Sequence, residues 1–334
     1  MTHRERAVAA LERRQPDFVP HFELAFLETD RDFDGRTFYG AAGCPGFNGV
    51  AYREAIAHNA RLYIDIARKF DHSIICLNGS KPQNYPDFTQ GIIDLVRSIR
   101  EQVGDEFLIL CHGDATYSVP GNDMMEFTTR LMEDPQGVKR EAELRVAEKL
   151  VQCKRMLQAG VDGFTLCSDY AFNSGPFLSP GMFADFVAPY LKLLVHEQRA
   201  LGAYVIKHTD GNIMPVLDMI LEAEPHALHS IDPMAGMDIR LIKKEYGSRV
   251  ALCGNVHCAY MQTGTPDQIS ESADYCLRWA KPGGGYLFST SNSIFRGMPL
   301  ESYDLIHRIW RQKREYEKPR LAEGNNRGEI PCHC

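Results

Sequence analysis

Short apolar, β-branched runs alternate along the chain with longer segments in which apolar residues recur at helical spacing. Strands with helices between them are typical of a parallel sheet with right-handed crossovers. A count of eight strands favours a closed α/β barrel, so the predicted fold is a (β/α)8 TIM barrel. The eight predicted strands cover residues 19–26, 72–79, 107–114, 163–169, 204–211, 226–232, 250–256 and 285–292.

The segments between the strands support this fold. Helices are expected within residues 134–160, 182–202, 212–224 and 266–281. An open doubly wound sheet is the alternative, but no GxGxxG follows the first strand. The glycines of "KPGGGY" precede a strand instead of opening a helix, so they are poor evidence for a dinucleotide site. We expect them to form a turn at the opposite, stability-determining face of the barrel.

The chain is interpreted as one barrel domain over residues 1–334, with a short N-terminal helical extension at 1–18. Thr2 and Glu5 have the spacing of a capping box, and Pro16 ends the helix that they begin. A flexible C-terminal tail is expected from about residue 320 to residue 334.

Composition excludes several classes of function. The chain is 44% hydrophobic and 24% charged, with a formal net charge of −7, as expected for a soluble globular protein. The acidic balance argues against nucleic-acid binding, and the apolar runs are too short to cross a membrane. The N-terminus lacks the apolar core of a signal peptide. None of the ten cysteines forms a CxxC pair, so a reducing cytoplasm is expected.

Nearly every predicted strand ends in a polar or ionisable residue. In a barrel these ends meet at the C-terminal face, which carries the active site, so the pattern predicts an enzyme. Turns are also polar, and any single member can serve as a turn or a cap. The residues at these ends are Glu23, Asn78, His112, Asp169, His208, Asp210, Asp232, Asn255, His257 and Asn292.

The stretch "AYVIKHTDGN" places His208 and Asp210 two residues apart where an apolar strand ends. Residues i and i+2 of a strand point to the same face, so both side chains are expected at one point of the rim. They are interpreted as metal ligands or a catalytic pair, with Asp210 raising the pKa of the imidazole. Alternatively, Asp210 caps the next helix and His208 bonds a backbone carbonyl.

Aromatic and amide side chains surround Asp169 in "SDYAFNSG". The rings of Tyr170 and Phe172, with Asn173 beside them, would suit an aromatic substrate, although the same rings could roof the barrel. His112 and Glu23 are candidates to orient substrate or to complete a metal site.

Several motifs resemble the uroporphyrinogen decarboxylase superfamily, over essentially the whole chain and in order. They are "RERAVAALERRQPDFVP", "DYAFNSGPFLSPGMFADFVAPYLKLL", "HTDGN", "DPMAGMDI", "CGNVHC" and "GGGYLFSTSNSI". The resemblance implies a TIM barrel. It also implies either porphyrinogen decarboxylation or cobalamin-linked, often zinc-dependent, methyl transfer.

The decarboxylase branch implies arginines near the N-terminus that bind substrate carboxylates, and an aspartate after the second strand. Here the first region reads "HFELAFLETDRDFDGRTF", which is acidic, with Arg31 and Arg36 as its nearest arginines. Asn78 follows the second strand instead of a carboxylate. Decarboxylation without a metal is therefore the alternative reading.

The thiol-methylating branch implies a zinc held by His-x-Cys and a later cysteine. This chain has His208, then Asp210 in place of the first cysteine and Asn292 in place of the second. Imidazole with carboxylate still suits zinc, but the site is harder than one with thiolates.

The chain is most similar to the O-demethylase-like members. That resemblance implies methyl transfer from a methoxylated, often aromatic, small molecule to a corrinoid protein, assisted by Zn²⁺ or an acid. A non-catalytic tetrapyrrole-binding member is a further alternative, and a homodimer is expected by analogy. The catalytic residues would be His208, Asp210 and Asp169, with His208 and Asp210 as metal ligands. The substrate would contact Glu23, His112, Tyr170, Asn173, Asn255 and Asn292.

Overall fold

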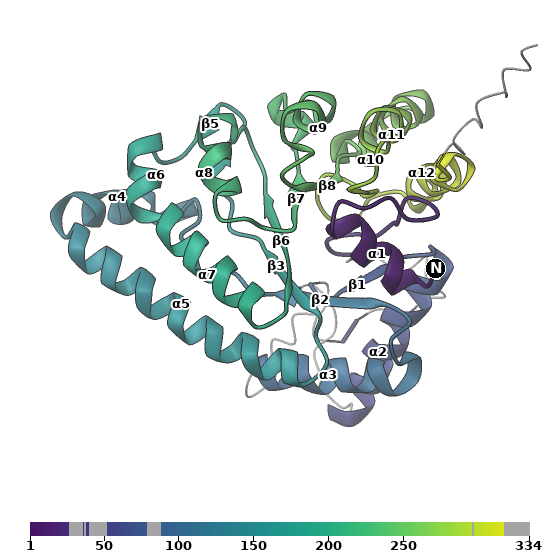
Figure 1. Ribbon diagram of the computed structural model, residues 1–334, viewed down its shortest axis with the longest axis horizontal. Helices are drawn as coiled ribbons and strands as arrows, with labels where there is room; N and C mark the ends of the chain where they lie inside the picture. The colour runs from purple at the N-terminus through teal and green to yellow at the C-terminus, as the bar shows by residue number, and fades with distance from the viewer. Residues whose placement is uncertain (27–35, 37, 40–51, 79–87, 296, 317–334) are drawn as a thin grey trace, which may run out of the picture.

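A computed structural model describes residues 1–26, 36, 38–39, 52–78, 88–295 and 297–316 (Figure 1). Arg31 and the predicted C-terminal tail lie outside this part of the chain. The main sheet has seven parallel strands in the order β1-β2-β3-β6-β7-β8-β9, which confirms seven of the eight predicted strands. The strands are β1 (Ile74–Cys76), β2 (Leu108–His112), β3 (Gly163–Leu166), β6 (Tyr204–Thr209), β7 (Ala227–Ser230), β8 (Ala251–Gly254) and β9 (Tyr286–Leu287).

The first predicted strand, at 19–26, closes the barrel through isolated bridges. His21 makes parallel bridges to both His72 and Phe288, which lie beside β1 and β9 at the two edges of the sheet. The amide of Ser73 donates to the His21 carbonyl over 2.7 Å, and the amide of Phe288 donates to the Pro20 carbonyl over 2.9 Å. The predicted α/β barrel fold is thereby confirmed.

Helices cover the outside of the barrel, and α5 and α7 lie side by side outside β3 and β6 (Figure 1). The helix expected within 182–202 is two helices, because Pro189 lacks the amide hydrogen that would continue the first one. Of the helices in the described ranges, none is long and apolar enough to span a membrane. The longer helices are α1 (His3–Leu11), α2 (Tyr52–Lys69), α3 (Phe88–Val103), α4 (Met124–Glu133), α5 (Pro135–Gln158), α7 (Ala188–Ala200), α11 (Pro266–Ala280) and α12 (Leu300–Lys313). The shorter ones are α6 (Pro180–Phe186), α8 (Leu217–Leu221), α9 (Ile239–Tyr246) and α10 (Cys258–Thr263).

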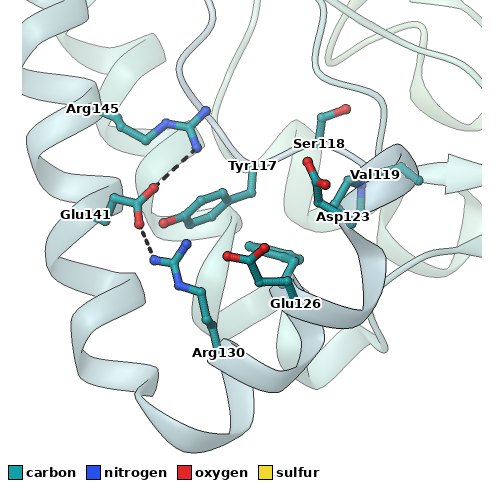
Figure 2. A pocket seen from close by; sticks show the side chains of 10 residues that line it. Tyr117, Ser118, Val119, Asp123, Glu126, Arg130, Glu141 and Arg145 are labelled. Carbon is teal, nitrogen blue, oxygen red and sulfur yellow. Dashed lines mark hydrogen bonds and ion pairs between the residues drawn. The ribbon is translucent and has the colours of Figure 1, made fainter.

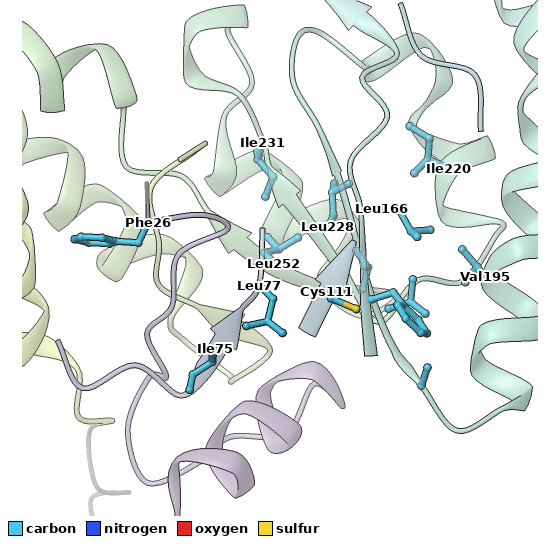
Figure 3. Close-up of a cluster of buried hydrophobic side chains, with 14 of the residues drawn as sticks. Phe26, Ile75, Leu77, Cys111, Leu166, Val195, Ile220, Leu228, Ile231 and Leu252 are labelled. Atoms are coloured by element: carbon cyan, nitrogen blue, oxygen red, sulfur yellow. The ribbon is translucent and has the colours of Figure 1, made fainter. Parts of the chain in front are cut away.

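Alternation along the strands divides the buried apolar residues into two layers. Ile75 and Leu77 belong to the outer layer between strands and helices, which Figure 3 shows with residues from the neighbouring strands. Ile74 and Cys76 belong to a smaller cluster inside the barrel. Because successive strand residues face opposite sides, one strand fills both layers.

Helix α1 closes the N-terminal end of the barrel. The predicted capping box is present, since the Thr2 side chain accepts from the Glu5 amide and Glu5 bonds back. Ala7, Ala10 and Leu11 are fully buried in the inner cluster. The chain after α1 runs against the turn before β9, where a Cβ on Gly284 would lie 2.7 Å from the Gln15 nitrogen.

Leu11→Ala tests whether the packing of α1 against the N-terminal end of the barrel stabilises the fold. We expect the free energy of unfolding to fall by about 2–5 kcal/mol, because the substitution leaves a cavity inside the barrel. Leu144→Ala is the control, since Leu144 is 65% exposed, and should change it by less than about 0.5 kcal/mol. Equal losses of unfolding free energy in Leu11→Ala and Leu144→Ala, measured by urea unfolding, would contradict this stabilising role.

Candidate metal and catalytic site

Three side chains from two neighbouring strands converge at the C-terminal rim. His208 lies near the end of β6, Asp210 follows that strand, and Asp169 follows β3, its parallel neighbour. His208 Nε2 is 3.7 Å from Asp169 Oδ1 and 3.8 Å from Asp210 Oδ1. One ligand atom from each residue lies within 4.8 Å of the other two. The structure therefore brings together the three residues that the sequence predicts as catalytic.

The donor set of this group fits a divalent metal. Ligands bonded to a tetrahedral zinc at about 2.0–2.2 Å lie roughly 3.4 Å apart, close to the 3.7 and 3.8 Å found here. Imidazole nitrogen and carboxylate oxygen both bind zinc, and a site built from them is harder than a thiolate site. Asp169, His208 and Asp210 are thus the residues that would hold a metal.

Asp210 is held by hydrogen bonds from three directions. Ser230 Oγ donates to Oδ1 over 2.7 Å, and the Asn292 side-chain amide donates to Oδ2. The Asp210 amide in turn donates to Asp169 Oδ1 over 2.9 Å. Burial raises the pKa of Asp210 to about 7, and the carboxylates of Asp169 and Asp232 add to this. Asn292 therefore orients a ligand-capable carboxylate, in the position where the resemblance implied a ligand.

Ser230 reaches Asp210 through an unusual backbone conformation. Its φ of 83° and the φ of 48° at Ile231 lie in the left-handed region, which costs energy for residues with a Cβ. Such strain is concentrated at functional sites.

The raised pKa expected for His208 is wrong. Burial lowers its pKa to about 3, and the neighbouring Lys207 ammonium acts in the same direction. The imidazole is therefore neutral near pH 7, which is the form that binds a metal. A proton at this site would instead be carried by the carboxyl of Asp210.

A buried ion pair supports the chain that leads to Asp169. Lys207 Nζ lies 3.2 Å from Asp114 Oδ2, and both side chains are at most 1% exposed. Lys207 also donates to the Ser168 carbonyl over 2.7 Å, while the Ser168 amide donates to Asp114 over 2.9 Å. Burial alone would raise the pKa of Asp114, but Lys207 and hydrogen bonds from Thr116 and Ser168 lower it well below its usual range. The pair thus fixes the residue directly before Asp169.

Glu23 and Asn255 brace the rim in the structure. Glu23 accepts from the Thr290 amide and hydroxyl, the latter over 2.5 Å, and burial raises its pKa to about 8. Asn255 donates to the Ile231 carbonyl over 2.7 Å. Their substrate contacts remain predictions.

The remaining predicted substrate residues differ in exposure. His112 ends β2 and Asn173 lies in the turn between β4 (Ala171–Phe172) and β5 (Gly175–Pro176), and both are exposed. Tyr170 is only 3% exposed, with its hydroxyl 2.7 Å from Thr116 Oγ1 and its ring centroid 4.0 Å from Lys207 Nζ. Tyr170 therefore packs against Lys207 behind the site, and its substrate contact remains a prediction.

Sequence reasoning missed four residues that hold the site: Asp114, Lys207, His229 and Ser230. A lysine inside a strand that reads as buried was a signal for Lys207, because a buried ammonium needs a partner. His229 is the register partner of His208 on β7, which no single strand reveals.

A separate hollow of about 370 Å³ lies outside the rim, between α4, α5 and the segment after β2 (Figure 2). Arg130 and Arg145 both pair with Glu141 there. Two more carboxylates, of Asp123 and Glu126, line it, so the arginines are outnumbered. The hollow is not a basic pocket for a polycarboxylate.

The comparisons with known proteins agree with the barrel fold. The model of the uroporphyrinogen decarboxylase (URO-D) family matches residues 78–311. The fold is similar to that of a methyltransferase from Methanosarcina mazei, with a TM-score of 0.72 and 16% identity over 93% of this chain and 99% of that one. It is also similar to a putative vitamin-B12 independent methionine synthase from Listeria monocytogenes, with a TM-score of 0.53 and 11% identity over 89% and 96% of the two chains. No curated protein sequence matches the chain.

Lys207→Met tests the buried ion pair. We expect a loss of about 3–5 kcal/mol in the free energy of unfolding, because Asp114 is left charged and unpaired in the interior. Arg249→Gln is the control, since it breaks an exposed pair with Asp218 and should cost less than about 1 kcal/mol. A similar, small loss in both variants would refute the role of the pair.

Glu23→Gln tests the raised pKa of Glu23. A carboxyl whose folded pKa of about 8 exceeds its ordinary 4.5 contributes stability below pH 4.5 that is lost as the pH rises through 8. The variant should therefore gain stability relative to wild type between those values, by up to roughly 1.4 kcal/mol per pH unit. Urea unfolding from pH 5 to 9 measures the difference in stability between the variant and the wild type. Glu148→Gln, on the exposed face of α5, is the control. A stability difference between Glu23→Gln and the wild type that does not change with pH would disprove the raised pKa of Glu23.

Proposed function

The chain belongs to the uroporphyrinogen decarboxylase family, and on this premise we propose that it is a methyltransferase. Its donor would be a methoxylated small molecule, with a methoxyarene as the typical case, and its acceptor a corrinoid carried by a partner protein. The observation that carries this proposal is the convergence of Asp169, His208 and Asp210 at the C-terminal rim. The fold shared with the Methanosarcina mazei methyltransferase is compatible with it.

Demethylation of an ether requires help at oxygen. When the methyl carbon leaves, the oxygen keeps the bonding electron pair and needs a cation or a proton. A zinc ion bound at this site would supply a Lewis acid for that oxygen. The chain's own part is to present the neutral His208 imidazole and two carboxylates, with Ser230 and Asn292 fixing Asp210.

The acceptor explains why the chain needs no nucleophile of its own, since a reduced corrinoid takes the methyl carbon. The side chains of Asp169 and Asp210 are 42% and 29% exposed, so the group is open to a donor and to a protein-borne acceptor.

The seven cysteines in the described residues are free thiols, which supports a cytoplasmic location.

The decarboxylase alternative finds less support in the described part of the rim. Asp169, Asp210 and Asp232 give this part of the rim a negative charge, whereas a porphyrinogen with several carboxylates needs arginines. Arg36, which the sequence offers as a nearby arginine for such a substrate, forms an ion pair with Asp65.

Elemental analysis of the purified protein, combined with a methyl-transfer assay, tests the proposal. We expect about one zinc per chain and transfer from a methoxyarene to an added corrinoid protein. His208→Ala should lose the zinc and reduce transfer by about 100-fold or more, because it removes a ligand. His196→Ala is the matched control, because His196 is 76% exposed on α7.

Three outcomes contradict the proposal. They are carbon dioxide release from a porphyrinogen by a zinc-free chain, tight tetrapyrrole binding with no turnover, and unchanged methyl transfer by His208→Ala. Each points to a different alternative, namely the decarboxylase, the non-catalytic binder or another site on the chain.

A further inference from the structure

Behind His208, a second buried histidine lies inside the barrel. His229 on β7 is the register partner of His208 on β6, and the two residues are 0% and 4% exposed. We infer that His229 is a positioning residue that holds the His208 imidazole in the tautomer with a bare Nε2, the atom directed at Asp169 and Asp210. This inference deepens the proposed function and rests on it for the role of the metal.

The contact between the two rings requires one proton. His208 Nδ1 and His229 Nδ1 are 2.8 Å apart, which is a hydrogen-bond distance. Of two imidazole nitrogens in such a contact, one carries the hydrogen and the other offers its lone pair. The direction of this bond therefore decides which nitrogen of His208 is bare.

The next groups along the network set that direction. His229 Nε2 lies 3.3 Å from Ser289 Oγ, and Ser289 Oγ lies 3.1 Å from the Thr290 carbonyl oxygen. A carbonyl only accepts, so the Ser289 hydroxyl donates to it and can accept from His229 Nε2–H. A neutral His229 with hydrogen on Nε2 has a bare Nδ1, which accepts from His208 Nδ1–H.

The consequence appears at the other side of His208. A neutral imidazole with hydrogen on Nδ1 has its lone pair on Nε2. That atom is the one 3.7 and 3.8 Å from the two carboxylates. The reverse direction would place a hydrogen on Nε2, where these distances are too long for hydrogen bonds. It would also place a hydrogen where a metal must bind. Hydrogen-bond acceptors for the second ring nitrogen commonly orient metal-binding histidines, and His229 supplies such an acceptor here.

Two variants of similar size separate a hydrogen-bonding role from a space-filling one. His229→Leu removes the acceptor for His208 Nδ1–H, whereas His229→Asn restores one through its side-chain oxygen. Nitrogen-15 NMR of the metal-free protein reads the tautomer of His208, and competition with a chelator reads zinc affinity. His196→Leu, at an exposed position, is the control for both measurements.

We expect the Nδ1–H tautomer in the wild type, its loss in His229→Leu and its return in His229→Asn. Zinc affinity should fall by about 10- to 100-fold in the leucine variant and recover in the asparagine variant. A wild-type protein with hydrogen on Nε2, or a leucine variant with unchanged tautomer and affinity, would overturn the inference. If the wild type shows the expected tautomer and its loss in His229→Leu but binds no zinc, the proposed function fails and the positioning role of His229 stands.

Discussion

The ion pair between Lys207 and Asp114 is the interaction on which the site depends, because it joins the C-terminal ends of β2, β3 and β6 at one buried point. Both charges are removed from water. Asp114 accepts from the Ser168 amide and Lys207 donates to the Ser168 carbonyl, so the pair fixes the backbone of the segment that follows β3. Asp169 is the next residue and starts from this fixed position. The pair therefore links the stability of the barrel to the geometry of its rim.

Strand alternation lets β6 contribute both to the stability of the barrel and to the site at its rim. Lys207 points outward into the ion pair, and the adjacent His208 points inward to the rim, as the two faces of a strand require. The same burial that stabilises this arrangement keeps the imidazole neutral and raises the pKa of Asp210. A neutral nitrogen beside two carboxylates is suited to a cation. The hydrogen bond that His208 makes to His229, and those that Asp210 accepts from Ser230 and Asn292, direct these groups toward one point.

Much of the fold could be predicted from sequence, because alternating apolar runs mark strands directly and the i, i+2 spacing places His208 and Asp210 on one face. The break before Pro189 was also visible in principle. Properties that depend on contacts between strands could not be predicted. His229 lies beside His208 only because of the register between β6 and β7, and Lys207 reaches Asp114 across the intervening strand β3. The pKa of His208 was predicted in the wrong direction because the sequence shows its carboxylate neighbours but not its depth.

We propose that Asp169, His208 and Asp210 hold one metal ion through oxygen and nitrogen atoms. X-ray absorption at the zinc edge of the zinc-loaded protein measures the ligand set. We expect a first shell of nitrogen and oxygen near 2.0–2.2 Å with the outer-shell scattering of one imidazole. A sulfur neighbour near 2.3 Å would contradict it, because the metal would then be bound by a cysteine instead.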